Sequence, residues 1–179
     1  MPHLPPIPDW ASLHPAIIHF PIVLLLMSPI WILISVLLTP ARGRAYLYAG
    51  LVLLLAGTAS LFVAVETGDA AAELAERTAT VDSVLHEHQN LASETMIVFS
   101  ALTVLLLLLC FLPRALRWQP TRFQFASLTL VFLALYATGA LSLVNTAHQG
   151  ARLVHQFGVH AVIPGDTSHQ QTSREAEPE

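Results

Sequence analysis

The sequence predicts an all-α membrane protein, a bundle of four transmembrane helices with both termini on the outer side of the membrane. Three observations support this fold class. Only 11% of the 179 residues are charged and 54% are hydrophobic, whereas a soluble domain carries about 25% charged residues. Four runs are long enough to cross the roughly 30 Å core of a bilayer as helices. These runs are apolar on every side, whereas the helices of a soluble bundle are polar on one face.

The four expected spans cover residues 15–38, 45–65, 92–112 and 123–146. The third span contains the aliphatic run Val104–Leu109, and the other three lie in segments without Asp, Glu, Lys or Arg. A short interfacial segment is expected at 147–163, which completes one transmembrane domain over residues 1–163. Residues 164–179 lack aromatic side chains and are typical of a disordered tail.

Composition excludes several kinds of site. Cys110 is the only cysteine and lies in an apolar run, which excludes disulfide frameworks, cysteine-based zinc sites and thiolate-bound iron–sulfur clusters. The net charge of −4 gives no indication of a nucleic-acid partner. No motif indicates a catalytic nucleophile, so an enzyme is not predicted.

Arginines predict the orientation. Five of the eight basic residues lie in the two short loops after the first and third spans: Arg42, Arg44, Arg114, Arg117 and Arg122. Neither loop contains an acidic residue. The positive-inside rule therefore puts both loops in the cytoplasm. The termini and the loop at 66–87 then face outward, on the periplasmic side of a bacterial inner membrane.

This topology gathers the histidines on one side. The chain has nine histidines and no lysine. All nine fall at or beyond the outer membrane face: His3, His14, His19, His86, His88, His148, His155, His160 and His169. Helix ends that lie far apart in the sequence therefore all carry histidines at the same face of the membrane.

The first span offers two candidate ligands. Pro15 suits the first turn of a helix, which puts His14 near the N-cap. His19 lies about 7.5 Å deeper at 1.5 Å per residue. Pro21 cannot donate to the carbonyl of Ile17, so a bend is expected there. A histidine inside an apolar run usually faces the bundle interior, and either a ligand or a hydrogen-bonded side chain fits His19.

A polar stripe precedes the third span. His86, Asn90 and Glu94 recur at intervals of four and share one helix face. A buried stripe would supply a ligand and its hydrogen-bond partners, and we expect His86 to face inward. His88 points to roughly the opposite face, where an exposed position is expected.

The segment after the fourth span holds a third set. His148, Arg152 and His155 share a face if the helix continues past Gly150. An amphipathic helix in the membrane interface explains the same pattern. Arg152 is a candidate partner for an anionic group such as a haem propionate.

Several imidazoles within an outward-facing bundle suggest a redox cofactor. Helix bundles build cofactor sites from side chains on facing helices, and two neutral imidazoles can fill both axial positions of haem b. The chain lacks C-x-x-C-H, which excludes covalent c-type haem. Copper or zinc is the alternative, bound by three histidines and a carboxylate such as Glu66 or Glu94.

The second span contains no histidine and many small residues. They are Ala49, Gly50, Ala56, Gly57, Ala59 and Ser60. Such residues permit close helix packing, which is the preferred interpretation, although they could also leave room for a macrocycle.

The segment His14-Pro-Ala-Ile-Ile-His19-Phe-Pro21-Ile resembles the HPxxVHFPI opening of a bacterial four-helix membrane family, the domain of unknown function 2231. Three further motifs are similar. Thr67-Gly68-Asp69 resembles the family's T-G-x-x-D, with the Asp one place early, and His86-x-x-x-Asn90 resembles its H-x-x-x-N. The segment from Gly150 to Val159 resembles its G-G-x-L-V-Y-x-x-G-V close, and the likeness spans about residues 10–163.

The resemblance carries expectations with it. His155 stands where the family usually has Tyr, and Gln149 where it has the first Gly, so the likeness favours His14, His19 and His86 over His155. Members of this family are often fused to, or encoded beside, Rieske or cytochrome c modules. The resemblance therefore implies a redox role at the membrane, with such a protein as partner.

These observations lead to one functional hypothesis. The chain is expected to be a b-type cytochrome-like protein that passes electrons between a periplasmic donor and a membrane partner or quinone. His19 and His86 are the preferred axial ligands, and His14, Asn90, Arg152 and His155 are further candidates at the cofactor. The alternatives are a copper- or zinc-binding protein and a structural or assembly subunit of a larger membrane complex.

Overall fold

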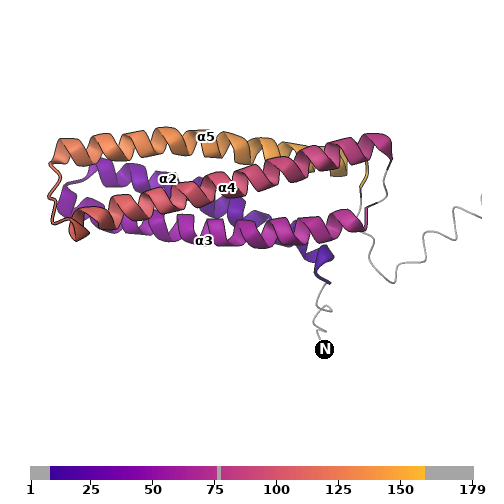
Figure 1. Ribbon diagram of the computed structural model, residues 1–179, viewed down its shortest axis with the longest axis horizontal. Helices are drawn as coiled ribbons and strands as arrows, with labels where there is room; N and C mark the ends of the chain where they lie inside the picture. The colour runs from indigo at the N-terminus through magenta and orange to yellow at the C-terminus, as the bar shows by residue number, and fades with distance from the viewer. Residues whose placement is uncertain (1–8, 76–77, 160–179) are drawn as a thin grey trace, which may run out of the picture.

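The computed structural model describes residues 9–75 and 78–159, which form a bundle of long helices packed side by side (Figure 1). The elements in order are η1 (Ala11–Leu13), α1 (His14–Ile17), α2 (His19–Leu37), α3 (Pro40–Glu73), α4 (Ala79–Ala115) and α5 (Arg122–His155). In the described part of the chain, four helical segments are long and apolar enough to cross a membrane, the first being Ala11–Leu37 taken together. The expected all-helical fold with four spans is confirmed.

Two prolines shape the first span. Pro15 lies in the first turn of α1, as expected from its missing N–H and its fixed φ. Helical structure is interrupted at Ile18, between α1 and α2. The cause is Pro21, which has no N–H to donate to the carbonyl of Ile17, where α1 ends.

Threonine side chains begin the last two helices. The Thr78 hydroxyl accepts a hydrogen bond from Val81 N at 3.3 Å at the start of α4. Thr121 and Gln124 form a reciprocal capping box at the start of α5, with N···O distances of 2.9 and 3.3 Å. Each cap satisfies N–H groups that have no partner within the helix.

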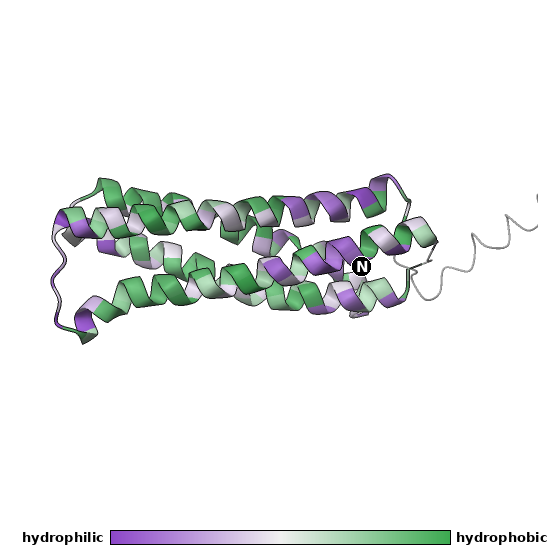
Figure 2. Cartoon of the chain, turned by 45° about the horizontal axis from the view of Figure 1, so that its top comes forward, coloured by the Kyte–Doolittle hydropathy of each residue, from purple (hydrophilic) through white to green (hydrophobic). Residues whose placement is uncertain are grey.

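The helices are longer than a bilayer requires. α3 and α5 each contain 34 residues and α4 contains 37, so each is about 50 Å long at 1.5 Å per residue. A bilayer core accounts for about 30 Å. Figure 2 shows apolar residues along most of the bundle, with hydrophilic residues gathered toward the end where α3 meets α4. The bundle therefore extends beyond the hydrocarbon at that end.

The expected interfacial segment at 147–163 is not separate from the fourth span. α5 continues without a break through Gly150 to His155. Leu153 is buried in a small apolar cluster with Val81, Val84 and Leu85 of α4. This packing keeps the end of α5 in the bundle, so an amphipathic helix lying on the membrane is the wrong interpretation for residues 147–155. Residues 160–163 and the expected tail lie outside the described residues.

The membrane core is one continuous apolar cluster. Its fully buried members come from all four spans: Leu25, Ile32, Leu54, Phe99, Leu106, Phe132 and Tyr136 are each at most 1% exposed. Glycines of α3 allow α2 to approach closely. A Cβ on Gly50 would lie 2.5 Å from the Ile32 side chain, and one on Gly57 would lie 2.7 Å from the Leu25 side chain. Gly50 and Gly57 of the second span thus serve helix packing, which was the preferred interpretation.

A buried tyrosine compensates for a proline inside α2. Pro29 has no N–H, so the carbonyl of Leu25 loses its partner in the helix. The Tyr136 hydroxyl of α5 donates to this carbonyl at 2.6 Å. Lipid cannot hydrogen-bond a backbone carbonyl, so this contact both satisfies α2 and ties it to α5.

We predict that Tyr136→Phe destabilises the protein by about 1–3 kcal/mol, the usual cost of an unsatisfied buried acceptor. Thermal unfolding in detergent measures this loss. In a Pro29→Ala background the Leu25 carbonyl regains an N–H partner, so Tyr136→Phe should cost less than half as much. An equal cost in both backgrounds would contradict the compensation.

Candidate functional site

Polar side chains form a layer near one end of the bundle. This polar layer consists of His14, Thr67, His88, Thr95, Ser142 and Thr146. Along α3, α4 and α5 it lies between the membrane core and the small cluster around Leu153. We call this the histidine end of the bundle, and the end with the two short arginine-containing loops the arginine end.

His88 of α4 is held by the backbone of α5. Its Nδ1 lies 3.0 Å from the carbonyl oxygen of Thr146. Because a carbonyl only accepts hydrogen bonds, Nδ1 must carry the proton. In the neutral ring, Nε2 therefore keeps its lone pair.

His14 at the start of α1 is held by a hydroxyl of α3. Its Nδ1 lies 3.2 Å from Thr67 Oγ1. The Thr67 hydroxyl already donates to the Val63 carbonyl at 2.8 Å, so its single proton is in use. We therefore assign the proton of this contact to His14 Nδ1, and the His14 ring also hydrogen-bonds the Ala64 backbone.

The two imidazoles belong to one electrostatic unit. The charge of His88 acts on His14, and the Asp69 carboxylate lies within electrostatic range of both rings. Asp69 Oδ1 accepts a hydrogen bond from Gln89 Nε2 at 2.9 Å, which links α3 to α4 beside the histidines. Three segments that are distant in the sequence thus meet at this site.

Glycines make room for both rings. A Cβ on Gly68 would lie 2.8 Å from His14 Cε1, and a Cβ on Gly150 would lie 3.0 Å from His88 Cε1. A larger side chain at either position would displace the ring. Thr95 of α4 completes the layer by hydrogen-bonding Ser142 Oγ at 2.8 Å and Thr146 Oγ1 at 2.9 Å.

This arrangement is suited to ligation. A histidine that binds a metal usually donates its other ring N–H to a carbonyl, carboxylate or hydroxyl, which fixes the tautomer and the ring orientation. His14 and His88 both have this form, and they come from different helices. The chemical capacity of the site is two oriented nitrogen lone pairs with a carboxylate nearby.

The expected inward position of His19 is wrong. Its side chain is exposed on α2. His14 and His19 are five residues apart, which is about 140° around a helix at 3.6 residues per turn. Because His14 faces the bundle, His19 must face away from it.

The prediction that the polar stripe on α4 faces the interior of the bundle is also wrong. His86 is exposed over 66% of its side chain and lies 3.9 Å from Asp82. Asn90 and Glu94 are exposed on the same face. α4 begins at Ala79, well before the expected span at 92, so this stretch has a polar outer face. The inward-facing position belongs to His88, which we expected to be exposed and which is half-buried.

The candidates on α5 lie at the surface. His148 and His155 are exposed, and Arg152 is half-buried. Arg152 donates to Gln149 Oε1 at 2.8 Å and to Gln156 Oε1 at 3.1 Å, and Gln149 in turn donates to Glu87 of α4 at 2.7 Å. These bonds tie the ends of α4 and α5 together. His3, His160 and His169 lie outside the described residues.

A signal for His88 was present in the sequence. The inward positions of α4 continue outward from the membrane core as Phe99, Thr95, the half-buried His88, Leu85 and Val84, with His88 seven residues before Thr95 and three and four residues after Leu85 and Val84. Extending the phase of the apolar core would have selected His88. Thr67 was marked only as part of the Thr67-Gly68-Asp69 motif and Thr146 not at all, because their role as partners depends on the approach of another helix.

Carboxylates do not join the histidines in a compact group. Within residues 9–75 and 78–159, no three His, Cys, Asp or Glu side chains gather closely enough to hold a metal ion. The two-histidine arrangement is therefore the site that the described residues offer.

Comparison with known proteins supports the membrane assignment. The family described as "Predicted membrane protein (DUF2231)" matches residues 11–162, which is most of the chain. No curated protein and no solved structure matches. The match includes both histidines and every helix of the bundle.

Proposed function

Since the chain belongs to the DUF2231 family of predicted membrane proteins, we propose that it is a membrane-integral electron-transfer protein in which His14 and His88 ligate haem b. The observation that carries this proposal is that the Nδ1 atom of each ring is paired with an oxygen of a neighbouring helix. His14 Nδ1 is paired with the Thr67 hydroxyl and His88 Nδ1 with the Thr146 carbonyl, which supports Nε2 as the proposed iron ligand of each ring. This pair replaces the expected pair of His19 and His86.

The donor set fits this cofactor. Two neutral imidazoles from different helices are sufficient for both axial positions, and such ligation supports electron transfer rather than oxygen chemistry. When bound, haem supplies a one-electron couple. Thr67 and the Thr146 carbonyl hold the ligand rings in orientation, and Thr95 and Ser142 anchor Thr146 beside them.

The position of the site suits electron exchange both with a water-soluble protein and with a partner inside the bilayer. The polar layer lies where the apolar core ends, so a water-soluble redox protein and a quinone in the bilayer could each approach it. A cytochrome c or Rieske-type donor is the proposed soluble partner, and a second membrane subunit is the alternative to quinone. The bacterial inner membrane is the proposed location.

A bound copper or zinc ion is the second candidate. The observation that favours it is Asp69, whose charge acts on both imidazoles. The two imidazoles would hold the ion and Asp69 would supply a compensating negative charge nearby, which suits a divalent cation more than a macrocycle.

Absorption spectra distinguish these candidates. We predict sharp Soret and α bands in the purified protein after dithionite reduction, provided that the expressing cells are replete in haem. His14→Ala and His88→Ala should each remove the bis-histidine spectrum. His19→Ala and His86→Ala are matched controls on the same helical segments, and both should retain it because their rings are exposed.

Three outcomes would count against the haem assignment as stated. A colourless protein with one copper or zinc per chain would favour the ion. A colourless protein free of metal would favour a structural role. Loss of the bands in the His19 and His86 variants alone would restore the pair expected from the sequence.

The orientation is part of the proposal. The arginine end is proposed to face the cytoplasm and the histidine end the periplasm, because loops rich in arginine are retained inside. An alkaline phosphatase fused after Glu179 should then be active, since this enzyme folds only outside the cytoplasm. A matched fusion in the loop after Leu116 should be inactive. The reverse pattern would overturn the orientation.

A further inference from the structure

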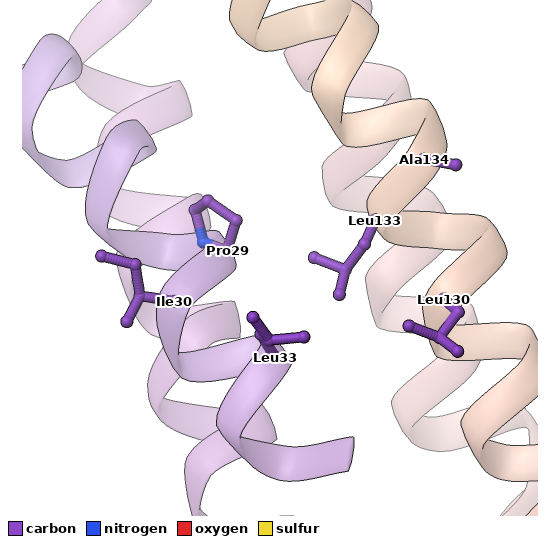
Figure 3. A pocket seen from close by; sticks show the side chains of 6 residues that line it. All are labelled: Pro29, Ile30, Leu33, Leu130, Leu133 and Ala134. Carbon is purple, nitrogen blue, oxygen red and sulfur yellow. The ribbon is translucent and has the colours of Figure 1, made fainter. Parts of the chain in front are cut away.

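Two apolar grooves open on the sides of the bundle, within the spans. The first lies between α2 and α5 and has a volume of about 440 Å³ (Figure 3). Its lining is entirely hydrocarbon: Pro29, Ile30, Leu33, Leu130, Leu133 and Ala134. It carries no polar group that would select one occupant over another.

The second groove, of about 500 Å³, lies toward the arginine end. Its lining is Trp31 of α2 with Ala45, Tyr48, Ala49, Val52 and Leu53 of α3. The groove is open at this position because the side chains of Ala45 and Ala49 are small. The groove runs from residue 45 to residue 53 of α3, about 12 Å along the helix.

Stacked aromatic pairs border this groove on two sides. Trp31 stacks on Tyr46 with ring centroids 5.8 Å apart. Tyr48 stacks on Phe111 of α4 with centroids 6.0 Å apart. Aromatic side chains of this kind concentrate at the level of lipid headgroups, so the border indicates where the headgroup region begins.

A cation is fixed at the edge of the groove. Arg114 of α4 donates from NH1 to the Tyr48 hydroxyl at 2.9 Å, and its side chain is exposed. Arg44, next to Ala45 of the lining, is also exposed. The segments at 38–48 and 111–122 contain five arginines and no acidic residue, so neither segment supplies a carboxylate to complement this edge.

We propose that this groove and Arg114 form a binding site for one anionic phospholipid. An acyl chain lies against Ala45, Ala49 and Val52, and the headgroup phosphate pairs with the guanidinium of Arg114, with Arg44 nearby. An apolar groove inside a span excludes water as its occupant, and a basic pocket between helix ends selects an anionic headgroup. Because this site lies at the end opposite the histidines, the lipid proposal is independent of the haem proposal and can be tested separately.

Native mass spectrometry of the purified protein, titrated with phosphatidylglycerol or with phosphatidylcholine of identical chains, tests this site. We predict tighter binding of phosphatidylglycerol. Arg114→Gln should weaken it about fivefold, the effect of one arginine near an anionic headgroup, while Arg122→Gln at the same end changes it little. Ala49→Leu should fill the groove and weaken both lipids, whereas Ala134→Leu in the groove of Figure 3 should not.

Each alternative result overturns the proposal. Equal binding of the two lipids would show no headgroup selection. Equal effects of Arg114→Gln and Arg122→Gln would show only a diffuse positive field. Unchanged lipid binding in Ala49→Leu, with the monodisperse elution of a folded protein, would show that the groove is not the site. A dimer that Ala49→Leu converts to a monomer would identify a second copy of the chain as the occupant.

Discussion

Every polar group inside this bundle must find its partner within the protein, because the surrounding hydrocarbon offers none. The consequences appear along the whole length of the core. Tyr136 satisfies the carbonyl that Pro29 leaves open in α2. The Thr58 and Thr103 hydroxyls pair across α3 and α4 at 2.9 Å. Where the apolar core ends, His14 and His88 likewise pair with oxygens of neighbouring helices, and these contacts orient the two rings.

The sequence was sufficient for the architecture but not for the site. Long apolar runs predict membrane helices without reference to any neighbour, so the four spans followed directly. An inward position depends instead on the phase of a helix. His86, Asn90 and Glu94 look like a functional stripe because they share one helix face. The apolar core of α4 lies on another face, so the stripe is the polar outer face and His88 turns inward.

The hydrogen-bond partners of the histidines could not be predicted from the sequence for a different reason. Thr67 and Thr146 are ordinary hydroxyl residues in their own helices. They matter because the close approach of α1 to Gly68 and of α4 to Gly150 brings an imidazole to each. Such approaches depend on tertiary packing, and a local pattern of residue types does not encode them. His14 was recognised as a candidate, but its partner and tautomer required the neighbouring helix.

The central claim is that His14 and His88 both carry their proton on Nδ1 and present Nε2 at one site. Nitrogen NMR of protein labelled with ¹⁵N-histidine tests this most directly, with His14→Gln and His88→Gln used to assign the two rings. Spectra recorded at alkaline pH, where the imidazoles are neutral, should show Nδ1 protonated and Nε2 unprotonated in both residues. A proton on Nε2 of either ring would contradict the account, because the nitrogen proposed as a ligand would then have no lone pair.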